Sequence, residues 1–362
     1  MKPIFNKRMN KLINSTLVIC LLSLCTCLDQ IDLEIPKGFD DALAIQGILV
    51  KSNPSYFELT VSRLFDFTPE SADQVNVREV ILTDEAGNSV EIERTGTGLY
   101  RTTFDENNSD IEIEIGKSYK INFRTFDDRS FESTLEPLVA APKIDTITYE
   151  TINKQFVFTD GITTFQDSAV QYNLNTSLQD PTTGENRSVL WNIFRVYQLT
   201  DPFKTCYITQ EIEVTDVKVF DGFGSSLPSL ENYNLHQDRF SSFYAEAMYF
   251  EVIQSGLSEG AFRYWNETNQ VLERDGNMFE APAGKVVSNF YNINDPDELV
   301  FGYFYATTQD TARIYVAPEV VNNPNSICNP PPSTGPNEPP PQCGNCLILE
   351  TSTTVKPDYW IE

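Results

Sequence analysis

Most of the chain alternates hydrophobic and polar residues with the two-residue period of β-strands. Short runs rich in β-branched and aromatic residues recur between turn residues, and each such run predicts a strand. In the first part of the chain these runs are 42–50, 56–64, 77–84, 89–93 and 119–126. Gly87 and Asn88, which tolerate positive φ angles, predict a tight hairpin between the third and fourth runs. Strands at this spacing are typical of a sandwich or a barrel.

A segment without periodicity follows these strands. Residues 136–142 contain two prolines, and a new strand is expected from Ile144, so we place a domain boundary here. The first domain, 41–140, is expected to be an immunoglobulin- or prealbumin-like β-sandwich. The second, 141–321, is expected to be a larger antiparallel β domain, sandwich or barrel, so that the fold class is mostly β. Its predicted strands are 170–177, 189–197, 206–214, 243–253, 300–307 and 313–316.

One helix is predicted within the second domain, near 258–275. Ser258 is a good N-cap, because its side-chain oxygen can accept a hydrogen bond from a backbone N–H of the first turn. Phe262, Trp265 and Leu272 recur at spacings of three and seven, which places them on one helix face. Gly276 stands where a glycine commonly ends a helix.

The N-terminus has the organisation of an export signal. Four basic residues precede the apolar run 12–24, which at thirteen residues is too short to span a bilayer as a helix. The following Leu-Cys-Thr-Cys resembles a bacterial lipobox, so we expect residues 1–26 to be a lipoprotein signal peptide and Cys27 to be the acylated residue. Cys25 is the alternative, although it would put a leucine where a small residue is expected. An ordinary secretory peptide is the other interpretation.

The residues after Cys27 are acidic. We interpret 27–40 as a lipid-anchored tether whose Asp29, Asp32 and Glu34 resemble the surface-export signal of Bacteroidota lipoproteins. The expected location is therefore the outer membrane, lipid-anchored and exposed at the cell surface. An anchor that faces the periplasm is the alternative.

The charge of the chain excludes nucleic acid as a main partner. Its 26 Lys and Arg against 52 Asp and Glu give a net charge of −26, and binding phosphates requires an excess of basic residues. Removal of the signal peptide, with its four basic residues, leaves about −30. Attachment to a membrane would then depend on the lipid rather than on charge.

Four cysteines follow the anchor, at Cys206, Cys328, Cys343 and Cys346. In an oxidising compartment they are expected to form disulfides, in one of three pairings. A Cys328–Cys343 bridge would close the proline-rich loop of segment 322–362 and contribute about 3 kcal/mol. That segment is otherwise expected to be extended, with little packing of its own. Zinc bound by the four thiols is a weaker alternative, and no metal or other cofactor is expected.

The chain contains one candidate for a catalytic serine. Residues 256–260 match the G-x-S-x-G pattern around Ser258, yet the single histidine, His236, precedes this serine and no alternating strand–helix pattern surrounds it. We therefore expect Ser258 to cap a helix, His236 to lie in a polar surface loop, and the protein to have no catalytic residues. A secreted serine hydrolase is the least favoured alternative.

Other side chains could bind ligands or carry modifications. Phe301, Tyr303 and Tyr305 share one face of a strand and could stack on a sugar or peptide, although core packing is the default for such rings. The acidic cluster 294–298 could bind calcium but is more typical of a solvated turn. Three Asp-Ser/Thr triplets resemble the O-glycosylation sites of exported Bacteroidota proteins, with acceptors Thr146, Ser168 and Thr311.

Together these features resemble a family of Bacteroidota outer-membrane lipoproteins known only as a domain of unknown function. The matching segments run through the mature chain: 31–36, 98–102, 142–145, 257–258, 264–265, 276–282, 288–290, 302–304, Cys343 with Cys346, and 356–360. Because the family has no established activity, the resemblance implies no functional residues. Its members are often encoded beside TonB-dependent transporters, which implies a surface-exposed, non-enzymatic accessory or binding subunit of such a β-barrel transporter, with an unknown ligand. The alternative is a structural or adhesive envelope lipoprotein without a barrel partner.

Overall fold

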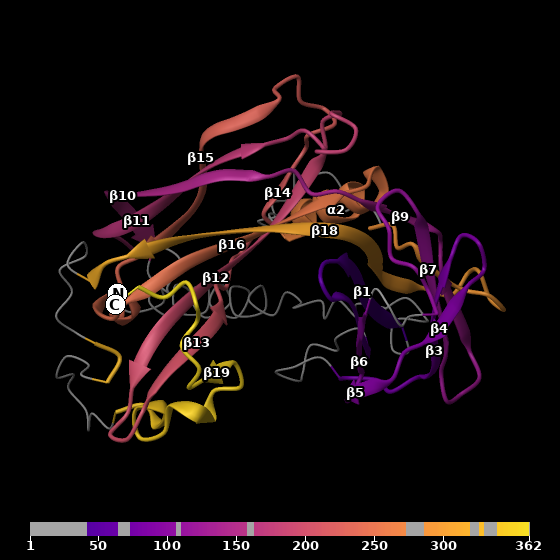
Figure 1. Cartoon of the computed structure of the whole chain (residues 1–362), viewed down its shortest axis with the longest axis horizontal. Coiled ribbons are helices and arrows are strands. Elements are labelled where there is room, and N and C mark those ends of the chain that lie inside the picture. The colour runs from indigo at the N-terminus through magenta and orange to yellow at the C-terminus, as the bar shows by residue number, and fades with distance from the viewer. Residues whose placement is uncertain are drawn as a thin grey trace, which may run out of the picture. The chain divides into compact units, whose positions relative to one another are not determined.

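Strands form most of the chain that the structure describes (Figure 1). The computed structural model describes residues 42–63, 73–105, 110–157, 163–272, 286–318, 326–328 and 339–361. The predicted signal peptide, Cys25, Cys27 and the tether 27–40 lie outside the described residues. Among the described residues, no helix is both long and apolar enough to cross a membrane.

The first part of the chain forms a β-sandwich, as predicted. Its inward-facing residues alternate with outward-facing ones, and the core contains fully buried rings such as Phe57, Tyr119 and Phe131. Residues 136–139, predicted to lie in an aperiodic linker, instead form a short strand. The strands are β1 (Leu43–Lys51), β2 (Ser55–Arg63), β3 (Arg78–Asp84), β4 (Ser89–Glu91), β5 (Arg94–Gly96), β6 (Leu99–Phe104), β7 (Ser118–Arg124), β8 (Ser130–Ser133) and β9 (Glu136–Val139).

One long strand belongs to both parts of the chain. Strand β18 (Val300–Val316) pairs in parallel with β1 over its first nine residues and antiparallel with β16 over its last eight. The prediction of two strands here is wrong, because the polar residues between them continue the pairing with β16. Gly302 allows the close approach to β1, since a Cβ at this position would lie 1.8 Å from the carbonyl oxygen of Ile45.

The second part of the chain is a sandwich rather than a closed barrel in the described residues. The sheet β10–β11–β15 packs on the sheet that contains β13, β12, β16 and β18, and Tyr172 stacks on Phe250 between them at 3.7 Å. Residues 243–245, predicted to begin the strand 243–253, instead lie in the 3-10 turn Ser242–Ala245. The strands are β10 (Ile144–Val157), β11 (Thr164–Ser177), β12 (Ser188–Thr200), β13 (Thr205–Glu211), β14 (Val219–Phe220), β15 (Ser229–Arg239), β16 (Met248–Leu257) and β19 (Ser352–Thr353). Strand β17 (Phe290–Asn292) pairs instead with β8 of the first sandwich.

The predicted helix is α2 (Glu259–Leu272), which follows directly on strand β16. Its apolar face includes Phe262 and Trp265, as the spacing predicts, and this face packs over Tyr303 and Tyr305 of β18. Leu272, predicted on the same face, is instead 56% exposed. Gly276, the predicted end of the helix, lies outside the described residues. Helix α2 is thereby fixed to the strand that both parts of the chain share.

Two disulfides fix the C-terminal segment, which confirms the expectation of paired cysteines. Cys328 bonds to Cys343, the bridge that closes the proline-rich loop, and Cys206 on β13 bonds to Cys346. The segment is more ordered than predicted: β19 pairs with β13, and Trp360 is buried against neighbouring tyrosines. These pairings leave none of the four thiols for zinc, and the described residues contain no group of three potential metal ligands.

Candidate functional site

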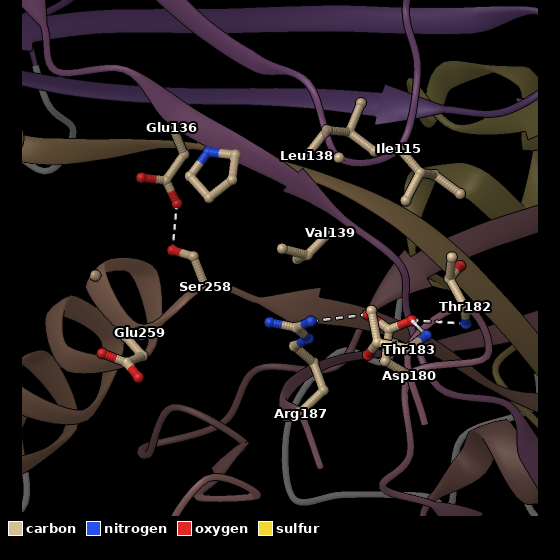
Figure 2. Close-up of a pocket in the computed structure, with 13 residues that line it drawn as sticks. Ile115, Glu136, Leu138, Val139, Asp180, Thr182, Thr183, Arg187, Ser258 and Glu259 are labelled. Carbon is tan, nitrogen blue, oxygen red and sulfur yellow. Dashed lines mark hydrogen bonds and ion pairs between the residues drawn. The ribbon is translucent and has the colours of Figure 1, made fainter. Parts of the chain in front are cut away.

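A cavity of about 550 Å³ opens beside strand β9, where the loop 180–187 and the start of helix α2 approach it (Figure 2). Ile115, Pro137, Leu138 and Val139 form an apolar side. Strand β9 is held on both edges, since it pairs with β7 and with β18. The apolar side is therefore carried by the shared framework of the molecule.

A buried carboxyl group lies at this cavity, on the first residue of β9. Glu136 is only 4% exposed; its side chain accepts hydrogen bonds from the hydroxyl of Ser258 and, at 3.1 Å, from that of Tyr303. Burial raises the pKa of Glu136 to about 7, because desolvation disfavours its charged form more than the two hydrogen bonds favour it. Close to neutral pH this group can therefore hold or release a proton.

Ser258 caps helix α2, as the sequence predicts. Its Oγ accepts a hydrogen bond from the N–H of Ala261 at 3.0 Å while its hydroxyl proton is donated to Glu136. The strand before it, β16, is antiparallel to both β12 and β18, unlike the parallel sheet beneath the nucleophile elbow of an α/β-hydrolase. The G-x-S-x-G match at 256–260 is thus explained by a strand-to-helix junction with a serine cap.

We expect Ser258→Ala to lower the free energy of unfolding by about 1–2 kcal/mol, because the helix loses its cap and Glu136 loses one of its two hydrogen bonds. Urea unfolding followed by circular dichroism measures this loss. Ser89→Ala, at an exposed strand position, is the matched control and should change stability by less than about 0.5 kcal/mol. Equal stabilities of the two variants would contradict the capping role.

The single histidine is not in a surface loop, and that prediction is wrong. His236 lies on strand β15, half-buried, with its ring parallel to that of Phe250. Burial lowers its pKa to about 4, with Lys218 and Arg195 adding to the effect, so it is neutral at pH 7. It lines a second, more polar cavity of about 360 Å³ and takes no part in the contacts of Ser258.

An ion pair stands on the opposite side of the first cavity. Asp180 accepts hydrogen bonds from the N–H groups of Thr182 and Thr183 at 2.7 and 3.1 Å, and its second oxygen accepts from Nη2 of Arg187 at 2.8 Å. Burial acts to raise the pKa of Asp180, but these bonds and the guanidinium charge together lower it. Nε of Arg187 is buried with no hydrogen-bond partner in the described structure.

The predicted aromatic row does not form an open platform in this structure. Tyr303 and Tyr305 are each 5% exposed, and helix α2 covers them through contacts of Tyr264 and Trp265. Core packing, the default interpretation, accounts for both rings. Phe301 is half-buried.

The remaining candidate sites lie at the surface. Thr146 on β10 and Thr311 on β18 are exposed, and Ser168 on β11 is half-buried, so their glycosylation stays a prediction. The acidic cluster 294–298 is a largely exposed turn between β17 and β18. Glu298 within it pairs with Arg129 at 2.6 Å.

Sequence reasoning did not find Glu136 or Arg187 as site residues. The prolines on either side of 138–141 led us to predict a linker, although one carboxylate amid apolar neighbours was a signal of a buried charge. Arg187 follows a polar turn and has no signal of its own, because its role depends on the cavity that distant segments form.

Comparisons with known proteins give a family but no activity. No curated protein matches the chain significantly. Among solved structures, a similar one is a crystal structure described as that of "a putative carbohydrate binding protein" from Bacteroides uniformis. It is 12% identical, the alignment covers 60% of this chain and 91% of that chain, and the TM-score is 0.15, so it carries no argument about this chain. The family model described as a domain of unknown function (DUF4249) matches residues 29–313, and the chain belongs to this family.

Proposed function

We propose that the protein is a lipid-anchored, surface-exposed outer-membrane protein that binds a small ligand as a non-enzymatic accessory subunit of a TonB-dependent β-barrel transporter. The observation that carries the binding function is the cavity beside β9. It combines an apolar side with a buried carboxyl group and a guanidinium, and binding pockets commonly combine apolar walls with a few placed polar groups.

The chemistry of the cavity favours binding over catalysis. The hydroxyl of Ser258 is engaged by the helix cap and by Glu136, and the described structure places no histidine at the cavity. A serine nucleophile needs a neighbouring base that takes its proton. Glu136 has a raised pKa and could take this proton, but the Oγ of Ser258 is held by the N–H of Ala261 in the helix cap, and Ser258 is only 8% exposed, so a substrate has little access to it.

The anchor is tested by Cys27→Ala. We expect this variant to lose incorporation of a labelled fatty acid and to leave the membrane fraction, because a thioether-linked lipid is the proposed attachment. Cys25→Ala is the matched control and should retain both label and membrane association. Loss of labelling in Cys25→Ala would assign the anchor to Cys25. Absence of label in the wild-type protein would overturn the lipoprotein proposal.

The barrel partner is tested by affinity purification of the membrane-bound protein in mild detergent. The proposal expects a TonB-dependent transporter to co-purify in a fixed ratio, and absence of any barrel would favour the structural or adhesive alternative. Digestion of whole cells with an added protease tests the leaflet, since only a surface-exposed protein would be cleaved. Cleavage confined to broken cells would indicate the periplasm-facing alternative.

A further inference from the structure

We infer that the cavity beside β9 binds a zwitterionic molecule with an apolar body, the chemistry of an apolar amino acid or short peptide with free ends. This inference rests on the proposed binding function and names the ligand class of the same cavity. Three features carry it: a guanidinium, carboxyl groups at the end of the cavity formed by β9 and α2, and an aliphatic wall.

The guanidinium belongs to Arg187, whose side chain is 15% exposed. Asp180 takes only Nη2, and Nε has no hydrogen-bond partner in the described structure. Figure 2 shows the other terminal nitrogen directed away from Asp180, toward the side of the cavity where Ser258 and Glu259 lie. A guanidinium nitrogen directed into a cavity can donate to a bound ligand, and a carboxylate suits the planar guanidinium best.

The carboxyl groups belong to Glu136 and Glu259. Glu136 is held by two hydroxyl groups rather than by a cation, and Glu259 is exposed in the first turn of α2 at the cavity. Asp180 already balances the charge of Arg187. The two glutamates are therefore the groups on which an ammonium could be neutralised.

One wall of the cavity is aliphatic. Ile115, Pro137, Leu138 and Val139 line it, and Ile115 is 44% exposed. A volume of about 550 Å³ lies within the roughly 300–1,000 Å³ of small-molecule sites. An apolar side chain of a bound amino acid or peptide would cover this wall and remove its apolar surface from water, which favours binding.

A ligand with one charge fits this arrangement less well than a zwitterion. A simple anion would be attracted by Arg187 but repelled by Asp180 and the glutamates. A simple cation would be repelled by the guanidinium. A zwitterion can place each charge against its opposite. Its ammonium beside Glu136 would also favour the ionised carboxylate, so binding near pH 7 should release protons to the buffer.

The test uses the mature protein and three probes: leucyl-leucine, its N-acetyl derivative and its C-terminal amide. We expect isothermal titration calorimetry at pH 7 to show leucyl-leucine binding at least about tenfold more tightly than either derivative, because each derivative loses one charge-assisted contact. Titrations in buffers of different ionisation enthalpy should show proton release with leucyl-leucine. Binding of all three probes with equal affinity, or of none at millimolar concentration, would overturn the inference.

Two variants locate the contacts. Glu259→Gln should weaken the binding of leucyl-leucine about tenfold and leave the affinity for the N-acetyl probe, which has no ammonium, unchanged. Arg187→Met should likewise weaken the binding of leucyl-leucine about tenfold and leave the affinity for the amide probe, which has no carboxylate, unchanged. Glu259 is exposed, so its variant keeps the test valid if Arg187→Met fails to fold. Arg101→Met, at an ion pair on β6 outside the cavity, is the control and should change nothing. A protein that is lipidated and co-purifies with a barrel, yet fails these titrations, would refute the ligand class alone.

Discussion

Replacing Gln254 by leucine is expected to lower the free energy of unfolding by about 4 kcal/mol. Gln254, on β16, is fully buried. Its Oε1 accepts hydrogen bonds from Nε1 of Trp191 at 2.6 Å and from the hydroxyl of Thr176 at 3.0 Å, and its Nε2 donates to the carbonyl oxygen of Pro142 at 2.7 Å. One side chain thus joins both sheets of the second sandwich to the segment that follows β9.

The size of this effect comes from the groups that would be left without partners. Leucine fills nearly the same space but leaves the indole N–H of Trp191 and the carbonyl of Pro142 buried and unsatisfied, at about 1–3 kcal/mol each. Thr176 can still donate to the carbonyl oxygen of Lys143 at 3.0 Å, so its loss is smaller. The remainder of the effect is the lost attachment of the 140–143 segment.

Urea unfolding monitored by tryptophan fluorescence measures the change, and Gln155→Leu, at an exposed position on β10, is the matched control. The double variant Gln254→Leu, Trp191→Phe should lose less stability than the sum of the single variants, because phenylalanine removes the orphaned N–H. Additive losses would show that Gln254 acts through packing alone.

The sequence predicted those parts of the fold that depend on local pattern. Alternation gave the strands of the sandwich, Ser258 marked the start of the helix, and the Cys328–Cys343 bridge was one of the three pairings left open. Each of these signals lies within about twenty residues of chain. The parallel pairing of β1 with β18 joins residues more than 250 positions apart, and no local pattern could reveal it.

The candidate site eluded prediction for the same reason. Glu136 was assigned to a linker, and its partners Ser258 and Tyr303 lie 122 and 167 positions away. His236 was assigned to a loop because polar neighbours surround it in sequence, whereas β15 pairs with β11 and one of its faces packs on the other sheet. In both cases tertiary packing, rather than local preference, decides the environment of the residue.

Glu136 should make stability depend on pH, and Glu136→Gln should remove that dependence. The pKa of Glu136 is raised from its ordinary 4.5 to about 7. Between these two values the folded chain keeps a proton that the unfolded chain has released, so rising pH favours unfolding. The stabilisation is complete below pH 4.5 and is lost as the pH rises through 7, at a total of about 3 kcal/mol.

His236 has the opposite effect over part of this range, so the wild-type curve alone does not isolate Glu136. Its pKa is lowered to about 4, and the folded chain therefore gains stability as the pH rises from 4 to the ordinary value of histidine near 6.5. Because Glu136→Gln leaves His236 unchanged, the difference in stability between the two proteins reports the ionisation of Glu136 alone. Glutamine resembles the protonated carboxyl group in shape and in hydrogen-bonding capacity.

The measurement is urea unfolding of wild type and Glu136→Gln at half-unit steps from pH 5 to 8.5. Relative to wild type, we expect the variant to become progressively more stable as the pH rises, by about 2–3 kcal/mol over the series. Glu91→Gln, at an exposed position on β4, should run parallel to wild type. Parallel curves for Glu136→Gln as well would mean that the carboxyl group is ionised throughout, and that water or a cation compensates its charge at the cavity.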